Sequence, residues 1–156
     1  LQMAVRPDGQ RSPLAGKLCA ALGRLAYEHN QLNDADQYIH QCIDLCRQWG
    51  ETDFQAIGCA MLARLEQARN NPEKAQEAMR EAELLIAGHP HSPIWSIQVR
   101  VDLARVSLAQ GNLERLSQHV QKRGTKIEDE ISSPREFDYY LLLRVLQRAR
   151  PRVRLK

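Results

Sequence analysis

An arginine recurs at nearly constant intervals along this chain of 156 residues. Each is the third residue of a Leu-x-Arg stretch, and successive members are 40, 41 and 39 residues apart: Arg24, Arg64, Arg105 and Arg144. A guanidinium group presents a planar fork of N–H donors that fits carboxylates and phosphates, and it stays charged at neutral pH. The series therefore consists of side chains suited to binding carboxylates, phosphates or acidic peptide segments.

No comparable set of residues in the sequence indicates catalysis. The sequence contains no Gly-x-Ser-x-Gly elbow, no H-E-x-x-H pair and no Gly-rich phosphate loop. The cysteines form neither a C-x-x-C pair nor a cluster with zinc spacing, and small apolar helix positions explain all four: Cys19, Cys42, Cys46 and Cys59. We therefore expect a protein that is not an enzyme and that binds no metal or cofactor through these residues.

The elements that must position the arginines are helices. Hydrophobic residues make up 43% of the chain but aromatic residues only 5%, and this composition favours helix over sheet. Apolar residues recur at spacings of three and four, with breaks at 30–31, 49–50, 70–72 and 111–112. The pattern predicts an all-α fold of about seven helices joined by short turns.

The first of these helices illustrates the expected packing. Its apolar residues form a row that we predict to face the neighbouring helix: Leu14, Leu18, Ala21, Leu22, Leu25 and Ala26. Helices that pack within about 8–10 Å of each other need small residues where their backbones come closest. We assign that role to residues at matching offsets: Gly23, Ala63 and Ala104, and in the following helices Ala35 and Ala75.

The matching offsets predict helical repeats. Units are expected at about 14–50, 52–88 and 93–124, followed by the first helix of a fourth unit at 134–149. Helix pairs that recur at a fixed period stack into a solenoid, in which each pair buries its apolar side against the next. We therefore expect one superhelical domain over residues 1–156, taken from a longer polypeptide.

Net charge says little about partners. The formal charge is +3, but residues 148–156 hold five basic residues and no acidic one, which leaves the rest of the chain slightly acidic. A nucleic-acid-binding domain spreads its positive charge over a folded face, so we do not expect DNA to bind here.

No apolar run is long enough to span a membrane and no signal peptide is present, so we expect a cytoplasmic protein without a membrane partner.

Two stretches carry a family resemblance. "LGRLAYEHNQLNDADQYIHQCIDLCRQWG" and "LARVSLAQGNLERL" resemble the repeat region of MalT-like, LuxR-family bacterial transcriptional activators. Their landmarks are similar to the tetratricopeptide (TPR) pattern, although the usual unit has about 34 residues and the units here are longer. HEAT and armadillo repeats have the longer period but lack these landmarks. The resemblance covers residues 14–149 and implies a right-handed superhelix of antiparallel helix pairs.

The resemblance also implies a function. MalT-like regulators join an ATP-binding module, a repeat sensor and a C-terminal helix-turn-helix, and only the sensor is represented in this sequence. ATP and DNA are therefore expected to bind separate domains of the parent protein. The expected partner of this region is a small-molecule effector, a regulatory protein or another domain of the same regulator.

In TPR arrays the residue two positions after the landmark leucine faces the concave surface, so the resemblance places the arginines there. The implied binding residues are Arg24, Tyr27, Arg64, Gln67, Arg105 and Arg144. One alternative is that each arginine pairs with a nearby acidic residue and only solvates the helix face. Another is that the chain is a free-standing scaffold that binds an acidic peptide or protein partner.

Overall fold

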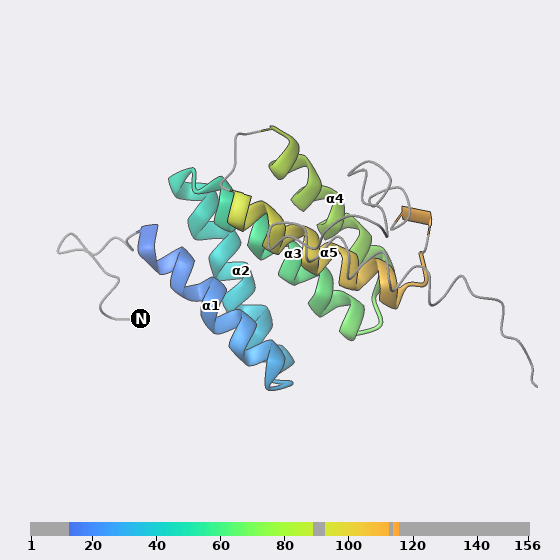
Figure 1. Ribbon diagram of the computed structural model, residues 1–156. Coiled ribbons are helices and arrows are strands. Elements are labelled where there is room, and N and C mark those ends of the chain that lie inside the picture. The colour runs from blue at the N-terminus through green and yellow to red at the C-terminus, as the bar shows by residue number, and fades with distance from the viewer. Residues whose placement is uncertain (1–12, 89–92, 113, 116–156) are drawn as a thin grey trace, which may run out of the picture. The chain divides into compact units, whose positions relative to one another are not determined.

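The computed structural model describes residues 13–88, 93–112, 114 and 115. Within these ranges the fold is all-α, as predicted, with five helices and no strand (Figure 1). The helices are α1 (Pro13–Glu28), α2 (Leu32–Trp49), α3 (Thr52–Ala68), α4 (Pro72–Gly88) and α5 (Pro93–Ala109). The helix predicted at 134–149 and most of the one predicted after the 111–112 turn lie outside the described residues, so the count of seven stays a prediction.

The first four helices form two antiparallel hairpins. α1 packs against α2 and α3 against α4, while α3 also contacts both helices of the first hairpin. Small residues occupy the close approaches, as predicted: Ala35, Ala63 and Ala75 are fully buried. A Cβ atom at Gly23 would lie 3.1 Å from Cγ1 of Ile39. The backbone of α1 at Gly23 therefore packs closely against the side chain of Ile39 on α2.

The turns repeat as closely as the helices do. Asn30 and Asn70 are 40 residues apart and both adopt the left-handed conformation, with φ of 59° and 62°. In each turn the residue after the asparagine donates its backbone N–H to the carbonyl five residues earlier, Gln31 to Ala26 and Asn71 to Glu66. This is the Schellman arrangement, in which a left-handed residue ends a helix and satisfies its last carbonyls. The helix pairs α1–α2 and α3–α4 are therefore two hairpins with equivalent turns, and the repeat bounds predicted at 14–50 and 52–88 stay a prediction.

Gly50 ends α2 in the same left-handed conformation, with φ of 68°. We expect Gly50→Ala to lower the free energy of unfolding by about 1 kcal/mol, because a Cβ atom disfavours this conformation. Gly88→Ala is the matched control: neither glycine has another atom within 4 Å of an added Cβ, but Gly88 has no left-handed φ. Urea unfolding should therefore separate the two variants, and equal effects would contradict the assigned cause.

The apolar row predicted for the first helix is wrong for three of its leucines, although Ala26, another member of that row, is buried. Leu14, Leu18 and Leu25 are 54%, 40% and 56% exposed. The buried face of α1 consists of smaller residues instead: Ala15, Gly16, Cys19, Ala20, Gly23 and Ala26. The physical reason is the closeness of α2, since a Cβ atom at Gly16 would lie 2.6 Å from Sγ of Cys46. Leucines do not fit into such an approach, so they lie on another side of the helix.

The chain divides into two compact units, and the boundary falls within α5, between Val106 and Ser107. The first unit contains α1 to α4 and α5 up to Val106. Of the second unit the structure describes the end of α5 and a turn in which Gly111 has φ of 72° and Asn112 donates to the carbonyl of Ser107. The single superhelical domain stays a prediction.

Candidate functional site

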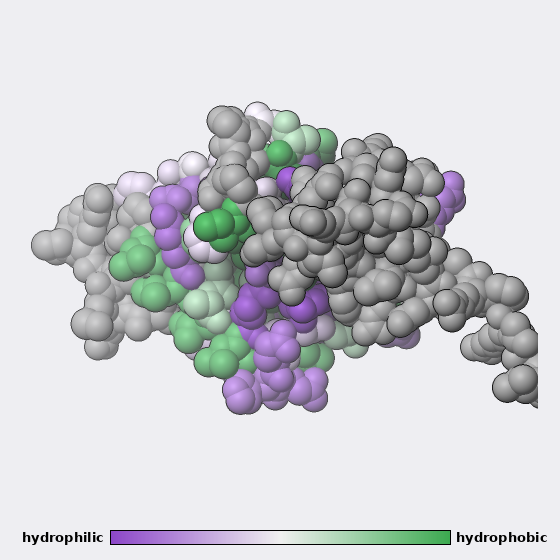
Figure 2. All heavy atoms as spheres, in the orientation of Figure 1, coloured by the Kyte–Doolittle hydropathy of each residue, from purple (hydrophilic) through white to green (hydrophobic). Residues whose placement is uncertain are grey.

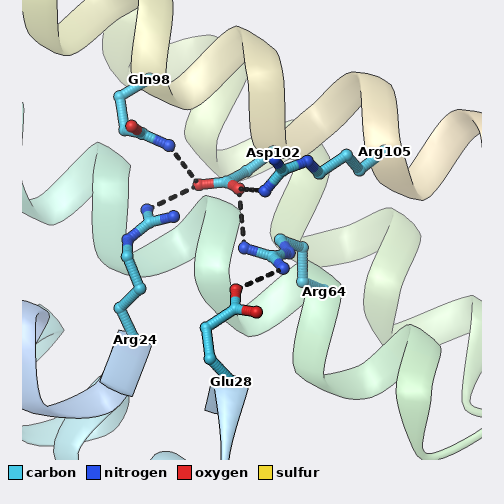
Figure 3. Close-up of polar contacts among 6 residues, drawn as sticks. All are labelled: Arg24, Glu28, Arg64, Gln98, Asp102 and Arg105. Atoms are coloured by element: carbon cyan, nitrogen blue, oxygen red, sulfur yellow. Dashed lines mark hydrogen bonds and ion pairs between the residues drawn. The ribbon is translucent and has the colours of Figure 1, made fainter. Parts of the chain in front are cut away.

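The three described arginines of the repeat series converge on one carboxylate. Arg24 comes from α1, Arg64 from α3, and Arg105 from α5, where Asp102 lies one turn earlier (Figure 3). These elements bring the groups together because each arginine occupies the equivalent position of its own helix. We call the group the Asp102 cluster and define it by Arg24, Glu28, Arg64, Gln98, Asp102 and Arg105.

The carboxylate of Asp102 is completely buried and bonded on both oxygens. Nη2 of Arg24 lies 2.8 Å from Oδ2, and Nη1 of Arg64 lies 3.0 Å from Oδ1. Nε2 of Gln98 donates to Oδ2 over 3.2 Å, while Nη1 of Arg105 approaches Oδ1 to 3.7 Å as an ion pair. A buried charge requires such partners, because moving a carboxylate out of water without them costs several kcal/mol of free energy.

Arg64 is the most enclosed of the three arginines, with a side chain only 11% exposed. Its Nη2 donates to Glu28 over 3.0 Å, and its guanidinium carbon lies 4.5 Å from the centre of the Tyr27 ring. Burial disfavours the charged guanidinium, but the attraction of Asp102 outweighs it together with the contacts of Glu28 and Tyr27. The net result is a raised pKa for Arg64.

The structure thus places most of the predicted site residues, although not in the predicted geometry. Arg24, Arg64 and Arg105 are not separate from one another, because all three pair with Asp102. All three are ion-paired, as the first alternative expected, but the acid that pairs them is buried and does not belong to a solvated surface. Tyr27 stacks on Arg64. Their role in binding a ligand stays a prediction.

Two predicted site residues lie outside this description. Gln67 is half-buried on α3, one turn after Arg64, and it is not a member of the Asp102 cluster. Arg144 lies outside the described residues.

Sequence reasoning missed the central residue, Asp102. A signal for it existed in the repeat register: the equivalent positions 41 and 81 residues earlier are Met61 and Ala21, both apolar. An acidic residue at a position that the repeat keeps apolar is expected to be buried, and a buried acid needs a cationic partner. The repeated arginines were the obvious source of that partner.

The charges of the cluster do not cancel. Three guanidinium groups face the two carboxylates of Asp102 and Glu28, which leaves a net charge of +1. The excess is accessible, because the side chains of Arg24 and Arg105 are 30% and 52% exposed. Chemically, the cluster is therefore able to accept a further carboxylate or phosphate at its solvent side through charge-assisted hydrogen bonds.

The cysteines form a second group of ionisable side chains, and all four are buried with free thiols. The hydrogen bond between Cys42 and Cys46 raises the pKa of Cys42 and lowers that of Cys46, and burial raises the pKa of Cys59 to about 12. The described residues contain no group of three or more His, Cys, Asp or Glu side chains placed to hold a metal ion. All four cysteines lie in the hydrophobic core.

Within the ranges that the structure describes, none of the helices combines the length and the apolar character that a membrane span requires.

Comparison with known families gave one result: the family model of the MalT-like TPR region matches residues 1–152. Searches of curated proteins and of solved structures found no match. The family match covers nearly the whole chain and includes every residue of the Asp102 cluster.

Proposed function

Since the chain belongs to the family of MalT-like TPR regions, we propose that it is the sensor and assembly domain of a LuxR/MalT-type, ATP-dependent transcriptional regulator. In this proposal the domain binds an anionic effector or an acidic segment of a regulatory protein. ATP and DNA bind to separate domains of the parent protein, and this region passes the state of the effector to them.

The observation that carries the proposal is the charge and exposure of the Asp102 cluster. Its net charge of +1 attracts anions, and the half-buried Arg24 and the exposed Arg105 offer donors that are not fully used by Asp102. Arginine binds carboxylates and phosphates through paired N–H groups, so the same site accepts either chemistry. Arg24 and Arg105 are the residues that would contact the ligand, and Arg64 would hold the cluster together.

The cluster also offers a way to transmit binding. Asp102 belongs to α5, whereas two of its partners belong to α1 and α3. An incoming anion competes with Asp102 for the guanidinium groups and so weakens the bonds that hold α5 against the preceding hairpins. A ligand shifts a conformational equilibrium only through such a difference in contacts between two states.

The proposal predicts that Arg105→Gln weakens the binding of acidic ligands. Isothermal titration of a hexaglutamate peptide into the chain should show binding that the substitution weakens about five- to tenfold, or about 1–1.4 kcal/mol. Inorganic phosphate, titrated separately, distinguishes a small anion from an acidic segment. Arg105 suits the test because its contact with Asp102 is the longest of the three and its loss leaves the buried carboxylate paired.

Arg80→Gln provides the matched control. Arg80 is an exposed arginine on α4, outside the Asp102 cluster, and its replacement changes the net charge by the same amount. Binding that both substitutions weaken equally would mean unspecific attraction to a basic surface. Absence of binding by the unchanged chain would contradict an anion-binding function. The alternative function, a free-standing scaffold for an acidic partner, predicts the same binding but no ATP-binding module in the parent protein.

A further inference from the structure

Two aromatic side chains meet where α3 and α5 begin. The ring centroids of Phe54 and Trp95 are 4.9 Å apart, with an angle of 54° between the ring planes. Phe54 packs against the hydrophobic core, whereas Trp95 is 37% exposed and its neighbour Ile94 is 69% exposed. Exposed tryptophans are enriched among the residues that contribute most to binding partners. The pair is therefore a candidate contact for an apolar side chain of a ligand.

Lys17 of α1 completes this group. Its Nζ lies 5.2 Å from the centre of the Phe54 ring and 3.1 Å from a carboxylate oxygen of Glu51. We call Lys17, Glu51, Phe54 and Trp95 the Trp95 patch. Because the ammonium beside the ring already has a carboxylate partner, the Trp95 patch offers apolar contact rather than a further site for an anion.

The Trp95 patch and the Asp102 cluster lie at two levels of the same helices. Trp95 precedes Asp102 by seven residues, or two helical turns, so both are on one face of α5. It precedes Arg105 by ten residues, and on α3 Phe54 precedes Arg64 by ten residues as well. Ten residues of a helix cover about 15 Å along its axis. An apolar contact and a cationic contact are thus held about 15 Å apart on both helices.

The repeat carries both groups. Leu14, Phe54 and Trp95 are 40 and 41 residues apart, the same intervals that separate the three arginines of the Asp102 cluster. The Trp95 patch joins the beginnings of α1, α3 and α5 and the Asp102 cluster joins their later parts, so the three helices run in the same general direction. Figure 2 shows hydrophobic side chains at the beginning of α5 and hydrophilic ones gathered toward the end of α1. The surface therefore has an apolar level and a charged level.

We infer that the ligand of the Asp102 cluster is an extended peptide segment with an apolar side chain four to five residues from its acidic group, and that the Trp95 patch receives the apolar side chain. The inference rests on the anion-binding function proposed above and specifies its ligand. An extended chain advances about 3.3 Å per residue, so four to five residues cover about 15 Å. A small aromatic acid such as phenylacetate is too short to reach both groups. The distance between the two levels thus favours a protein segment over a small-molecule effector.

Isothermal titration of three peptides with blocked ends and equal charge tests the inference. The first is Phe-Ser-Gly-Ser-Gly-Glu-Glu-Glu, the second has Ser in place of Phe, and the third has the composition of the first with Phe directly before the glutamates. The first should bind about five- to tenfold more tightly than the other two, because only its phenyl group reaches the Trp95 patch while its carboxylates reach the Asp102 cluster. Equal affinities would overturn the inference and leave anion binding intact. Absence of binding by all three peptides and by hexaglutamate would overturn the proposed function as well.

Trp95→Ala should reduce the affinity for the first peptide to that for the second and leave the affinity for the second unchanged. Leu84→Ala is the matched control, since Leu84 is an apolar residue of α4 that is 73% exposed, and it should change neither affinity. Circular dichroism confirms that each variant is folded, and the comparison of peptides on the unchanged chain needs no variant. A Trp95→Ala variant that still prefers the first peptide would overturn the inference.

Fluorescence locates the phenyl group. Trp49→Phe leaves Trp95 as the only tryptophan of the chain. Its emission should shift to shorter wavelength when the first peptide binds, because the phenyl group displaces water from the indole ring, and should stay unchanged with the second peptide. An unchanged emission at saturation with the first peptide would place the phenyl group elsewhere and overturn the inference. Phenylacetate that binds as tightly as the first peptide would assign the surface to a small molecule and also overturn it.

Discussion

Asp102→Asn is expected to lower the free energy of unfolding by about 3 kcal/mol. The substitution leaves Arg64, which is 11% exposed, without its buried counterion, and it leaves one acceptor oxygen where Arg24 and Arg64 now have one each. Removing one partner of a buried ion pair is costly, because the remaining charge stays in a place from which water is largely excluded. Equilibrium unfolding in urea, followed by circular dichroism, measures the loss.

Asp44→Asn is the matched control for this prediction. Asp44 also pairs with an arginine, Arg47 at 3.6 Å, but its side chain is 74% exposed, so we expect a change within about 0.5 kcal/mol. A double-mutant cycle of Asp102→Asn with Arg64→Gln should show strong coupling, since the second change removes the charge that the first one strands. Additive effects in the cycle, or equal effects of the two aspartate substitutions, would contradict the role assigned to Asp102.

Leu65→Ala is expected to destabilise the protein by about 2–5 kcal/mol, because Leu65 is fully buried and its truncation leaves a cavity in the hydrophobic core. The chain supplies its own control in Leu25, the equivalent residue of the preceding repeat, which is 56% exposed. Leu25→Ala should change the free energy of unfolding by no more than about 0.5 kcal/mol. The same substitution at the same repeat position thus isolates burial as the cause.

Thermal and urea unfolding of the chain of residues 1–156 should rank the two leucine variants in this order. A Leu25→Ala variant that loses as much stability as Leu65→Ala would contradict burial as the cause of the difference.

The helices and their limits were predictable because their signals are local. Asn30 and Asn70 mark the two turns within the hairpins, and asparagine tolerates the left-handed conformation that ends a helix there. Gly50 marks the end of α2 for the same reason. Residues that end helices need no information from distant parts of the chain, so the sequence alone was sufficient.

Which face of α1 is buried was not predictable from spacing. The helix has two apolar sides, one of leucines and one of small residues, and both recur with helical periodicity. The larger side chains gave the stronger signal, but the closeness of α2 decides the outcome in favour of glycine, alanine and cysteine. That closeness is a property of the packed pair and is not encoded by either helix alone.

The arginines of the candidate site could be predicted from the sequence, and the aspartate that pairs with them could not. The arginines stood out because they repeat, whereas Asp102 occurs once and belongs to α5. Its contact with Arg24 joins residues 78 positions apart, a distance over which spacing patterns carry no information. The one signal was that Asp102 is acidic where the equivalent residues of the two preceding repeats, Ala21 and Met61, are apolar.

That contact has a consequence for how the array comes apart. In a linear repeat protein each unit touches only its immediate neighbours, so end units fray independently of the rest. The bond from Asp102 to Arg24 passes over the middle repeat and ties the third unit directly to the first. Fraying of α1 then breaks a bond with α5 as well, so α1 and α5 are expected to come apart together with the helices between them, as one cooperative block.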